Sequence, residues 1–247
     1  MTEVKGWWSM LYAHTLVRIV ALIVFASFSY FIAMYAVAAV VGIANSLGAE
    51  WNVMTTTGSL LMRCVVYAVT ILLLAGWLRL GPHRLTLQSL GLNKFMQARD
   101  IGFGAVGFLG YGIVAMVVLY LLSHVPLFDA DQTQNIGVAS NYLYGVELWI
   151  AFAVLVVLVP IAEEIMFRGM LYGRLRQEGV RWWLSATIVS VLFGLAHGQW
   201  NVGIDVFILS MVACALREFT GSLWPSILVH ITKNLIAFSL LYVFIQP

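Results

Sequence analysis

Charged residues are scarce in this chain, because Asp, Glu, Lys and Arg together make up 10% of its 247 residues. A soluble domain usually carries about 25% charged residues, since its surface must face water. Hydrophobic residues make up 62% of the chain, and its mean hydropathy is +0.95. The shortage of charge therefore excludes an ordinary water-soluble fold and indicates that lipid surrounds most of the surface.

Cysteine and net positive charge are also sparse. The two cysteines, Cys64 and Cys214, both lie within apolar runs, which argues against a disulfide framework or a zinc–thiolate site. The formal net charge is only +2, and the basic residues are scattered rather than clustered in a patch. We therefore expect no nucleic-acid partner.

Long apolar runs, in contrast, occur along the whole chain. A membrane-spanning helix needs about 20 apolar residues. We predict an all-α fold, a polytopic transmembrane helical bundle of about seven to eight spans, with the lipid bilayer as a partner. The expected spans are 16–44, 58–78, 101–123, 144–176, 182–199, 204–216 and 223–245. Residues 1–140 form an N-terminal transmembrane region of about three spans, and residues 141–247 form a helical core of about four.

The third expected span carries a face of small residues. Gly104, Gly107 and Gly110 recur at intervals of three residues, which places them along one side of a helix. Small residues let helices approach closely in lipid. We expect this face to pack tightly against another helix.

The loops differ in their content of basic residues. The loop at 126–141 holds Asp129 and Asp131 and no Lys or Arg. Lys and Arg concentrate in cytoplasmic loops, so we predict a multi-pass protein of the cell membrane with a cytoplasmic N-terminus. The basic residues that carry this prediction are Arg79, Arg84, Lys94, Arg99, Arg174, Arg176 and Arg181.

Three short polar stretches interrupt the apolar pattern in the second half of the chain, at 162–168, 193–197 and 230–234. Ionisable groups inside a membrane helix cost at least ~2.5–3.5 kcal/mol each, so they are rare and usually functional. Glu164 and Arg168 are four residues apart, as are His230 and Asn234, and each pair shares a helix face. Glu163 lies about 100° around the helix from Glu164 and can occupy a different environment.

The depth of two of these groups can be compared. We expect the turn between the fourth and fifth spans at 178–181, where Gly179 can end a helix. Glu163 lies 16 residues before Gly179, and His197 lies 18 residues after it. At 1.5 Å per residue, these are distances of about 24 and 27 Å from the turn. An antiparallel pair of helices therefore places Glu163 and His197 at similar depth.

A buried carboxylate beside an imidazole suits general base catalysis, because the two groups can orient and deprotonate a water molecule. A second histidine with an asparagine supplies hydrogen-bond donors to a developing oxyanion. The reaction class that this combination predicts is hydrolysis of an amide or ester by activated water, without a Ser or Cys nucleophile.

These residues resemble the CAAX protease and bacteriocin-processing (CPBP, or Abi) family of intramembrane glutamate proteases. The signature of that family is Glu-Glu-x-x-x-Arg, then Phe-x-x-x-His, then His-x-x-x-Asn or Asp. All three motifs occur here in order, and the resemblance covers about residues 148–244. The residues that match are Glu163, Glu164, Arg168, Phe193, His197, His230 and Asn234.

The resemblance implies an intramembrane endopeptidase with assigned residue roles. Glu163 with His197 would activate water, His230 and Asn234 would stabilise the oxyanion, and Glu164 with Arg168 would form a supporting pair. The substrate would be a peptide or protein, including membrane-associated or lipidated ones, although a prenylated substrate does not carry over. We expect neither a cofactor nor a metal.

Three other functions compete with this interpretation. Glu163, His197 and His230 could form a zinc site, although the chain has no His-Glu-x-x-His motif. The polar cluster could instead grip a peptide or partner protein in a non-catalytic immunity or regulatory protein. A proton-coupled transporter is the third alternative, against which stands the lack of an inverted repeat.

Overall fold

The structure is a computed structural model that describes residues 14–80, 83–126, 128 and 143–244. These residues form helices and connecting loops, and none of them is in a strand. The predicted helical membrane bundle is thereby confirmed. The N-terminal half contains α2 (Thr15–Ser46), α3 (Thr56–Arg79), the short α4 (Leu87–Leu90) and α5 (Ala98–Leu122). Most of the loop at 126–141, with its two aspartates, lies outside the described residues.

The fourth predicted span is one continuous helical rod, Gly145–Gln177, whose hydrogen-bond register changes along its length. The rod comprises α6 (Gly145–Phe152), η1 (Ala153–Leu158), α7 (Val159–Glu164), η2 (Ile165–Tyr172) and α8 (Gly173–Gln177), of which η1 and η2 are π-helical. Gly179 follows with a left-handed φ of 84°, and α9 (Trp182–Leu195) begins directly afterwards. The turn predicted at 178–181 is therefore confirmed.

The chain ends in α10 (Trp200–Thr220), α11 (Trp224–Ser239) and the π-helical η3 (Leu240–Phe244). Five helical stretches are long and apolar enough to cross a membrane: Thr15–Ser46, Thr56–Arg79, Ala98–Leu122, Gly145–Gln177 and Trp224–Phe244. The predicted span at 182–199 is a shorter apolar helix of 14 residues. The chain is thus a multi-pass membrane protein, with fewer full-length spans among the described residues than the seven expected.

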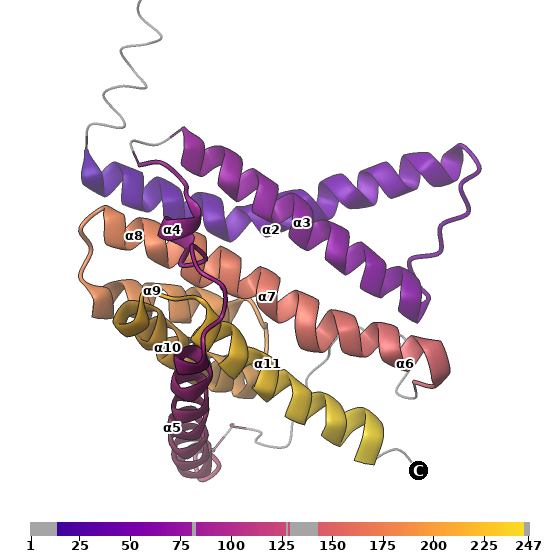
Figure 1. Ribbon diagram of the computed structural model, residues 1–247. Coiled ribbons are helices and arrows are strands. Elements are labelled where there is room, and N and C mark those ends of the chain that lie inside the picture. The colour runs from indigo at the N-terminus through magenta and orange to yellow at the C-terminus, as the bar shows by residue number, and fades with distance from the viewer. Residues whose placement is uncertain (1–13, 81–82, 127, 129–142, 245–247) are drawn as a thin grey trace, which may run out of the picture.

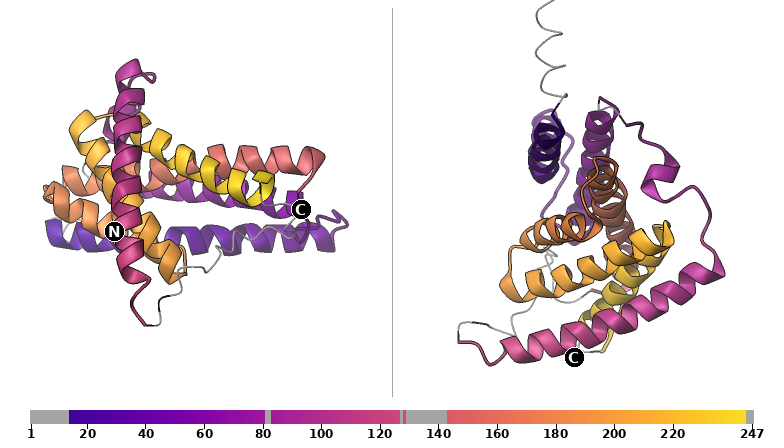
Figure 2. Two further views of the ribbon diagram at one scale, coloured as in Figure 1. Left: turned by 90° about the horizontal axis from the view of Figure 1, so that it is seen from below. Right: turned by 90° about the vertical axis from the view of Figure 1, so that its left-hand side faces the viewer.

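The helices pack around the Gly145–Gln177 rod. In Figure 1, α2 and α3 lie above the rod, and α9, α10 and α11 lie below it. Helix α5 packs against both α10 and α11, and it crosses α11 at a steep angle, which is plainest in the view from below in Figure 2. The rod is therefore covered on opposite sides by the N-terminal and C-terminal helices.

One hydrophobic cluster joins the two predicted regions. It contains Leu22 of α2 and Leu74 of α3 together with Met170 of η2 and Val189 of α9, all at most 4% exposed. The N-terminal helices therefore share a core with the C-terminal ones. The predicted boundary at residue 140 stays a prediction, and helices on both sides of it pack against each other in this cluster.

The glycine face predicted on α5 is confirmed at two of its three positions. A methyl group added at Gly104 would lie 3.1 Å from Leu228 of α11, and one at Gly107 would lie 2.7 Å from Leu216 of α10. Gly110 has no atom within 4 Å of such a methyl group. The prediction was wrong for Gly110, because the buried face of α5 continues from Gly107 through Tyr111 and Ala115. A spacing of three residues drifts away from that face, since successive turns of a helix take about 3.6 residues.

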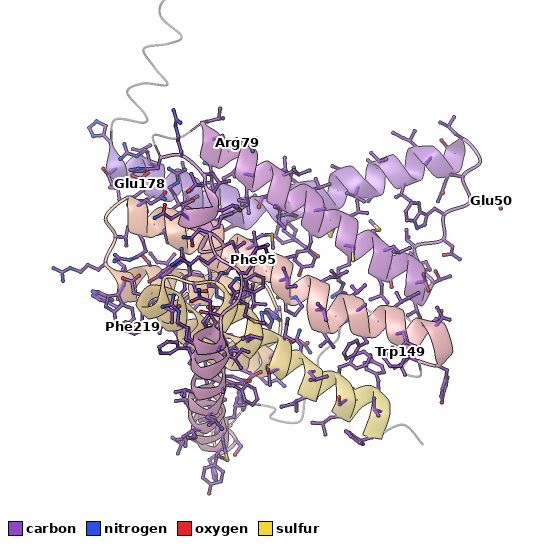
Figure 3. The ribbon with its side chains drawn as sticks, in the orientation of Figure 1. Glu50, Arg79, Phe95, Trp149, Glu178 and Phe219 are labelled. Atoms are coloured by element: carbon purple, nitrogen blue, oxygen red, sulfur yellow. The ribbon has the colours of Figure 1, made fainter. Side chains whose placement is uncertain are left out.

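Charged residues gather at one end of the long helices. Arg79 and Glu178 lie at this end in Figure 3, while Glu50 and Trp149 lie at the other. Arg18 of α2 pairs with Glu178 at 2.8 Å, and Arg174 donates hydrogen bonds to the carbonyl oxygens of Leu78 and His83. These contacts tie α2, α3 and α8 together at the polar end.

Candidate active site

The two neighbouring glutamates lie between the π-helical segments of the rod. Glu163 and Glu164 are the last residues of α7, which follows η1 and precedes η2. Short π-helical insertions inside α-helices occur frequently at functional sites. Glu163 is 8% exposed and Glu164 is fully buried, in a stretch whose neighbours are apolar.

Glu164 belongs to a buried ion pair. Its Oε1 lies 2.9 Å from Nη1 of Arg168, and both side chains are 0% exposed. The N–H groups of Arg168 make no well-aligned hydrogen bond among the described residues, so charge dominates this contact. The guanidinium also lies over the ring of Phe193, 4.5 Å from its centroid. The predicted supporting pair is therefore present, and an aromatic face completes it.

His230 of α11 bridges the two glutamates. Its Nδ1 lies 2.9 Å from Oε1 of Glu164, and its Nε2 lies 3.6 Å from Oε2 of Glu163. An ionised carboxylate only accepts hydrogen bonds, so Nδ1 carries the proton that it donates to Glu164. In the neutral imidazole this leaves Nε2 as an acceptor that faces Glu163.

Phe193 of α9 is the aromatic centre of the site. It is 1% exposed, and its ring packs edge-on against the rings of His197 and His230, with centroids 5.0 and 5.7 Å apart. Phe167 makes a similar contact at 4.9 Å. The Phe-x-x-x-His motif therefore supplies both an imidazole and the apolar surface that holds the imidazoles in place.

His197 lies just beyond the end of α9. Its Nδ1 lies 2.8 Å from the carbonyl oxygen of Phe193, one helical turn earlier, which leaves Nε2 free to face the site. Glu163, His230 and Lys233 are all near enough for their charges to act on this imidazole. The structure thus brings His197 and Glu163 into the same neighbourhood, as the depth comparison predicts.

Asn234 has a structural contact that sequence spacing did not reveal. Val159 donates to the carbonyl of Val154, a π-helical bond between residues five apart. The next bond of this register would join residue 160 to Leu155, but Pro160 has no N–H. Asn234 Nδ2 instead donates to the Leu155 carbonyl at 3.0 Å. One of the two side-chain N–H groups of Asn234 is thus bonded to the rod. The predicted role of Asn234 in stabilising the oxyanion depends on the second N–H group.

Two further polar groups escaped the sequence analysis. Tyr67 of α3 donates its phenol hydrogen to Oε1 of Glu163. Lys233 of α11 pairs with Asp205 of α10 at 3.4 Å, and Asp205 accepts a 2.6 Å hydrogen bond from Tyr111 of α5. Lys233 could have been noticed as a charge inside an apolar span, whereas Tyr67 is one of ten tyrosines and carries no such signal.

A zinc site at Glu163, His197 and His230 would require these side chains to converge on one point. Among the residues that the structure describes, no three His, Cys, Asp or Glu side chains are arranged to hold a metal ion. Glu163 and His230 approach each other, but Glu163 also accepts from Tyr67, and His230 donates to Glu164. These contacts fit a hydrogen-bonded network better than a ligand set.

Comparison with known proteins adds independent evidence. Residues 145–236 match the family described as type II CAAX prenyl endopeptidase Rce1-like. The matched segment includes all three motifs. The resemblance predicted from the motifs is thereby confirmed for this segment.

An uncharacterized 24.3 kDa protein of Escherichia coli is 29% identical over 139 residues, which cover 54% of this chain. The chain matches about 62% of the length of that curated relative. No solved structure gives a significant match.

Proposed function

We propose that this protein is an intramembrane endopeptidase that hydrolyses a peptide bond near the membrane with a water molecule activated by Glu163 and His197. The observation that carries the proposal is the arrangement of the two glutamates around His230. Glu164, neutralised by Arg168, fixes one side of His230, while Glu163 has no Lys or Arg partner within 4 Å among the described residues. Glu163 is therefore the carboxylate of the pair that no cation holds, and we assign it the role of the base that acts on water.

The positions of the polar atoms support the proposed catalytic roles. Oε2 of Glu163 and Nε2 of His230 lie 3.6 Å apart, too far for a direct hydrogen bond but close enough for both to contact one water molecule. His197 approaches from α9 and can orient the same water. We assign stabilisation of the oxyanion to the remaining N–H of Asn234 and to His230, which can donate from Nε2 only when its imidazole carries a second proton.

The low polarity of the surroundings strengthens these interactions. Phe193 is almost fully buried against both histidines, and electrostatic interactions gain strength where water is excluded. We propose a peptide or protein substrate, including membrane-associated or lipidated ones, that reaches the site in a cell membrane with the N-terminus of this chain in the cytoplasm.

The test compares peptide termini in cells that express the wild type or Glu163→Gln at equal protein levels. Mass spectrometry of membranes and medium should find new chain ends with the wild type that are absent with Glu163→Gln. Glu147→Gln is the matched control, because Glu147 is exposed in the first turn of the same rod. Glu147→Gln should give the wild-type set of termini.

The opposite result separates the proposal from the non-catalytic alternative. If wild type and Glu163→Gln yield identical termini while a phenotype of the protein survives the substitution, the polar cluster serves binding rather than hydrolysis. Loss of the products on chelation, restored by zinc, would instead favour the metal site.

A further inference from the structure

Tyr67 lies in the part of the chain that precedes the family match at 145–236. It is on α3, in the middle of a stretch long and apolar enough to span a membrane. Its phenol donates to Oε1 of Glu163 across 96 residues of sequence. Its ring packs against Tyr30 of α2, with centroids 5.8 Å apart. The glutamate proposed as the base is therefore contacted by the N-terminal helices.

The contact divides the two oxygens of Glu163 between two neighbours. Oε1 accepts from Tyr67, and Oε2 faces Nε2 of His230 at 3.6 Å. The terminal torsion of a glutamate is broad and only weakly restrained by its own chain. A donor fixed on one oxygen removes that freedom and holds the other oxygen toward the imidazole.

Two other tyrosine–carboxylate bonds show how Glu163 differs. Tyr111 donates to Asp205, which also pairs with Lys233, and Tyr172 donates to Glu218, which also pairs with Arg176 at 2.8 Å. Those carboxylates are neutralised by a cation, whereas Glu163 has no Lys or Arg within 4 Å among the described residues. A neutral phenol orients the carboxylate without cancelling its charge.

We propose that Tyr67 is a positioning residue that aims Glu163 at the reacting water, so that the catalytic unit includes α3 as well as α7, α9 and α11, the helices that carry the three motifs. This inference rests on the proposed function of the same site. It assigns to the N-terminal region the orientation of the proposed base, in addition to its share of the hydrophobic core.

The experiment measures kinetics of the full-length protein on a peptide made from a cleavage site found in the comparison of termini. Tyr67→Phe should lower kcat about ten- to hundredfold, the loss typical of one hydrogen bond to a charged group. KM should change less than about twofold, because the hydroxyl acts on Glu163 rather than on the substrate. Tyr172→Phe, which removes a tyrosine–glutamate bond elsewhere, should leave both constants unchanged.

A second variant separates positioning from packing. Tyr67→Leu removes the ring as well as the hydroxyl, so it should lose the same factor in kcat as Tyr67→Phe if the hydroxyl is what matters. The inference is overturned if Tyr67→Phe keeps the wild-type kcat, or if only Tyr67→Leu loses activity. Either result leaves the proposed function intact as long as Glu163→Gln is inactive, whereas activity of Glu163→Gln would refute the proposed function itself.

Discussion

At the scale of single residues, the most unusual feature is a pair of buried charges whose members have different neighbours. Glu164 contacts the guanidinium of Arg168 and the imidazole of His230, whereas Glu163 contacts the phenol of Tyr67 and faces the same imidazole. Adjacent glutamates reach such different surroundings because successive helical side chains point about 100° apart. One carboxylate can therefore support the site while the other acts.

The buried pair leads to a prediction about stability. Arg168→Met should lower the free energy of unfolding by about 3–5 kcal/mol, because it leaves Glu164 as an unpaired buried charge. The double variant Glu164→Gln/Arg168→Met should be more stable than Arg168→Met, since the amide oxygen of Gln can still accept from His230. Thermal unfolding of the purified protein in detergent measures both. A double variant that is less stable than Arg168→Met would contradict this account.

At the scale of elements, the close crossing of α9 and α10 positions His197. A methyl group added at Gly194 would lie 2.8 Å from the carbonyl oxygen of Gly203, and one added at Gly203 would lie 3.0 Å from that of Gly194. These are backbone atoms, which cannot move aside as a flexible side chain could. The two helices can approach this closely only because both residues lack a side chain.

The crossing predicts a difference between two Gly→Ala substitutions. Gly194→Ala should destabilise the protein by roughly 1–3 kcal/mol through overpacking, and it should reduce hydrolysis because His197 is three residues away. Gly110→Ala is the matched control, since that position is open and alanine favours a helix. Melting temperature and peptide cleavage should fall for Gly194→Ala alone. Equal effects of both substitutions would show that the contact does not constrain the site.

Pro160 changes the hydrogen bonding of the rod and thereby its contact with α11. Pro160 leaves the Leu155 carbonyl without its π-helical donor, and Asn234 of α11 supplies one. This bond fixes α11 against the rod one turn beyond His230. Asn234 therefore sets the register in which His230 meets both glutamates, whatever else it contributes to catalysis.

At the scale of the whole molecule, the polar contacts concentrate at one end of the bundle. Arg18, Arg174 and Glu178 join α2, α3 and α8 there, while the loop with Glu50 lies at the opposite end (Figure 3). Basic residues favour the cytoplasmic side. The arrangement supports an orientation in which the Glu178 end faces the cytoplasm.

This orientation can be measured by labelling single cysteines with a membrane-impermeant maleimide, after replacing Cys64 and Cys214 by serine. Glu50 and Arg84 are both exposed and lie in loops at either end of α3. Glu50→Cys should be labelled in intact cells, and Arg84→Cys only after the cells are permeabilised. The reverse pattern would show that the N-terminus faces outward.

The sequence by itself determined the fold class, the three motifs and the family that they resemble. Long apolar runs require helices in lipid, because every backbone polar group must be satisfied within its own segment. Local spacing also placed Glu164 with Arg168 and located the turn at Gly179, since both depend only on helical periodicity. The depth comparison anticipated that Glu163 and His197 would be neighbours, because an antiparallel pair obeys the same rise per residue.

Only the tertiary structure decided which groups complete the site. Tyr67 contacts Glu163 across 96 residues, and Asn234 contacts Leu155 across 79. Such pairings depend on how α3 and α11 pack against the rod. The spacing of residues within one helix does not determine where another helix packs against it. The π-helical segments on either side of α7 were likewise not predicted from the sequence. The motifs therefore predicted which side chains form the candidate site. The orientation of those side chains depends on contacts with helices that are distant in sequence.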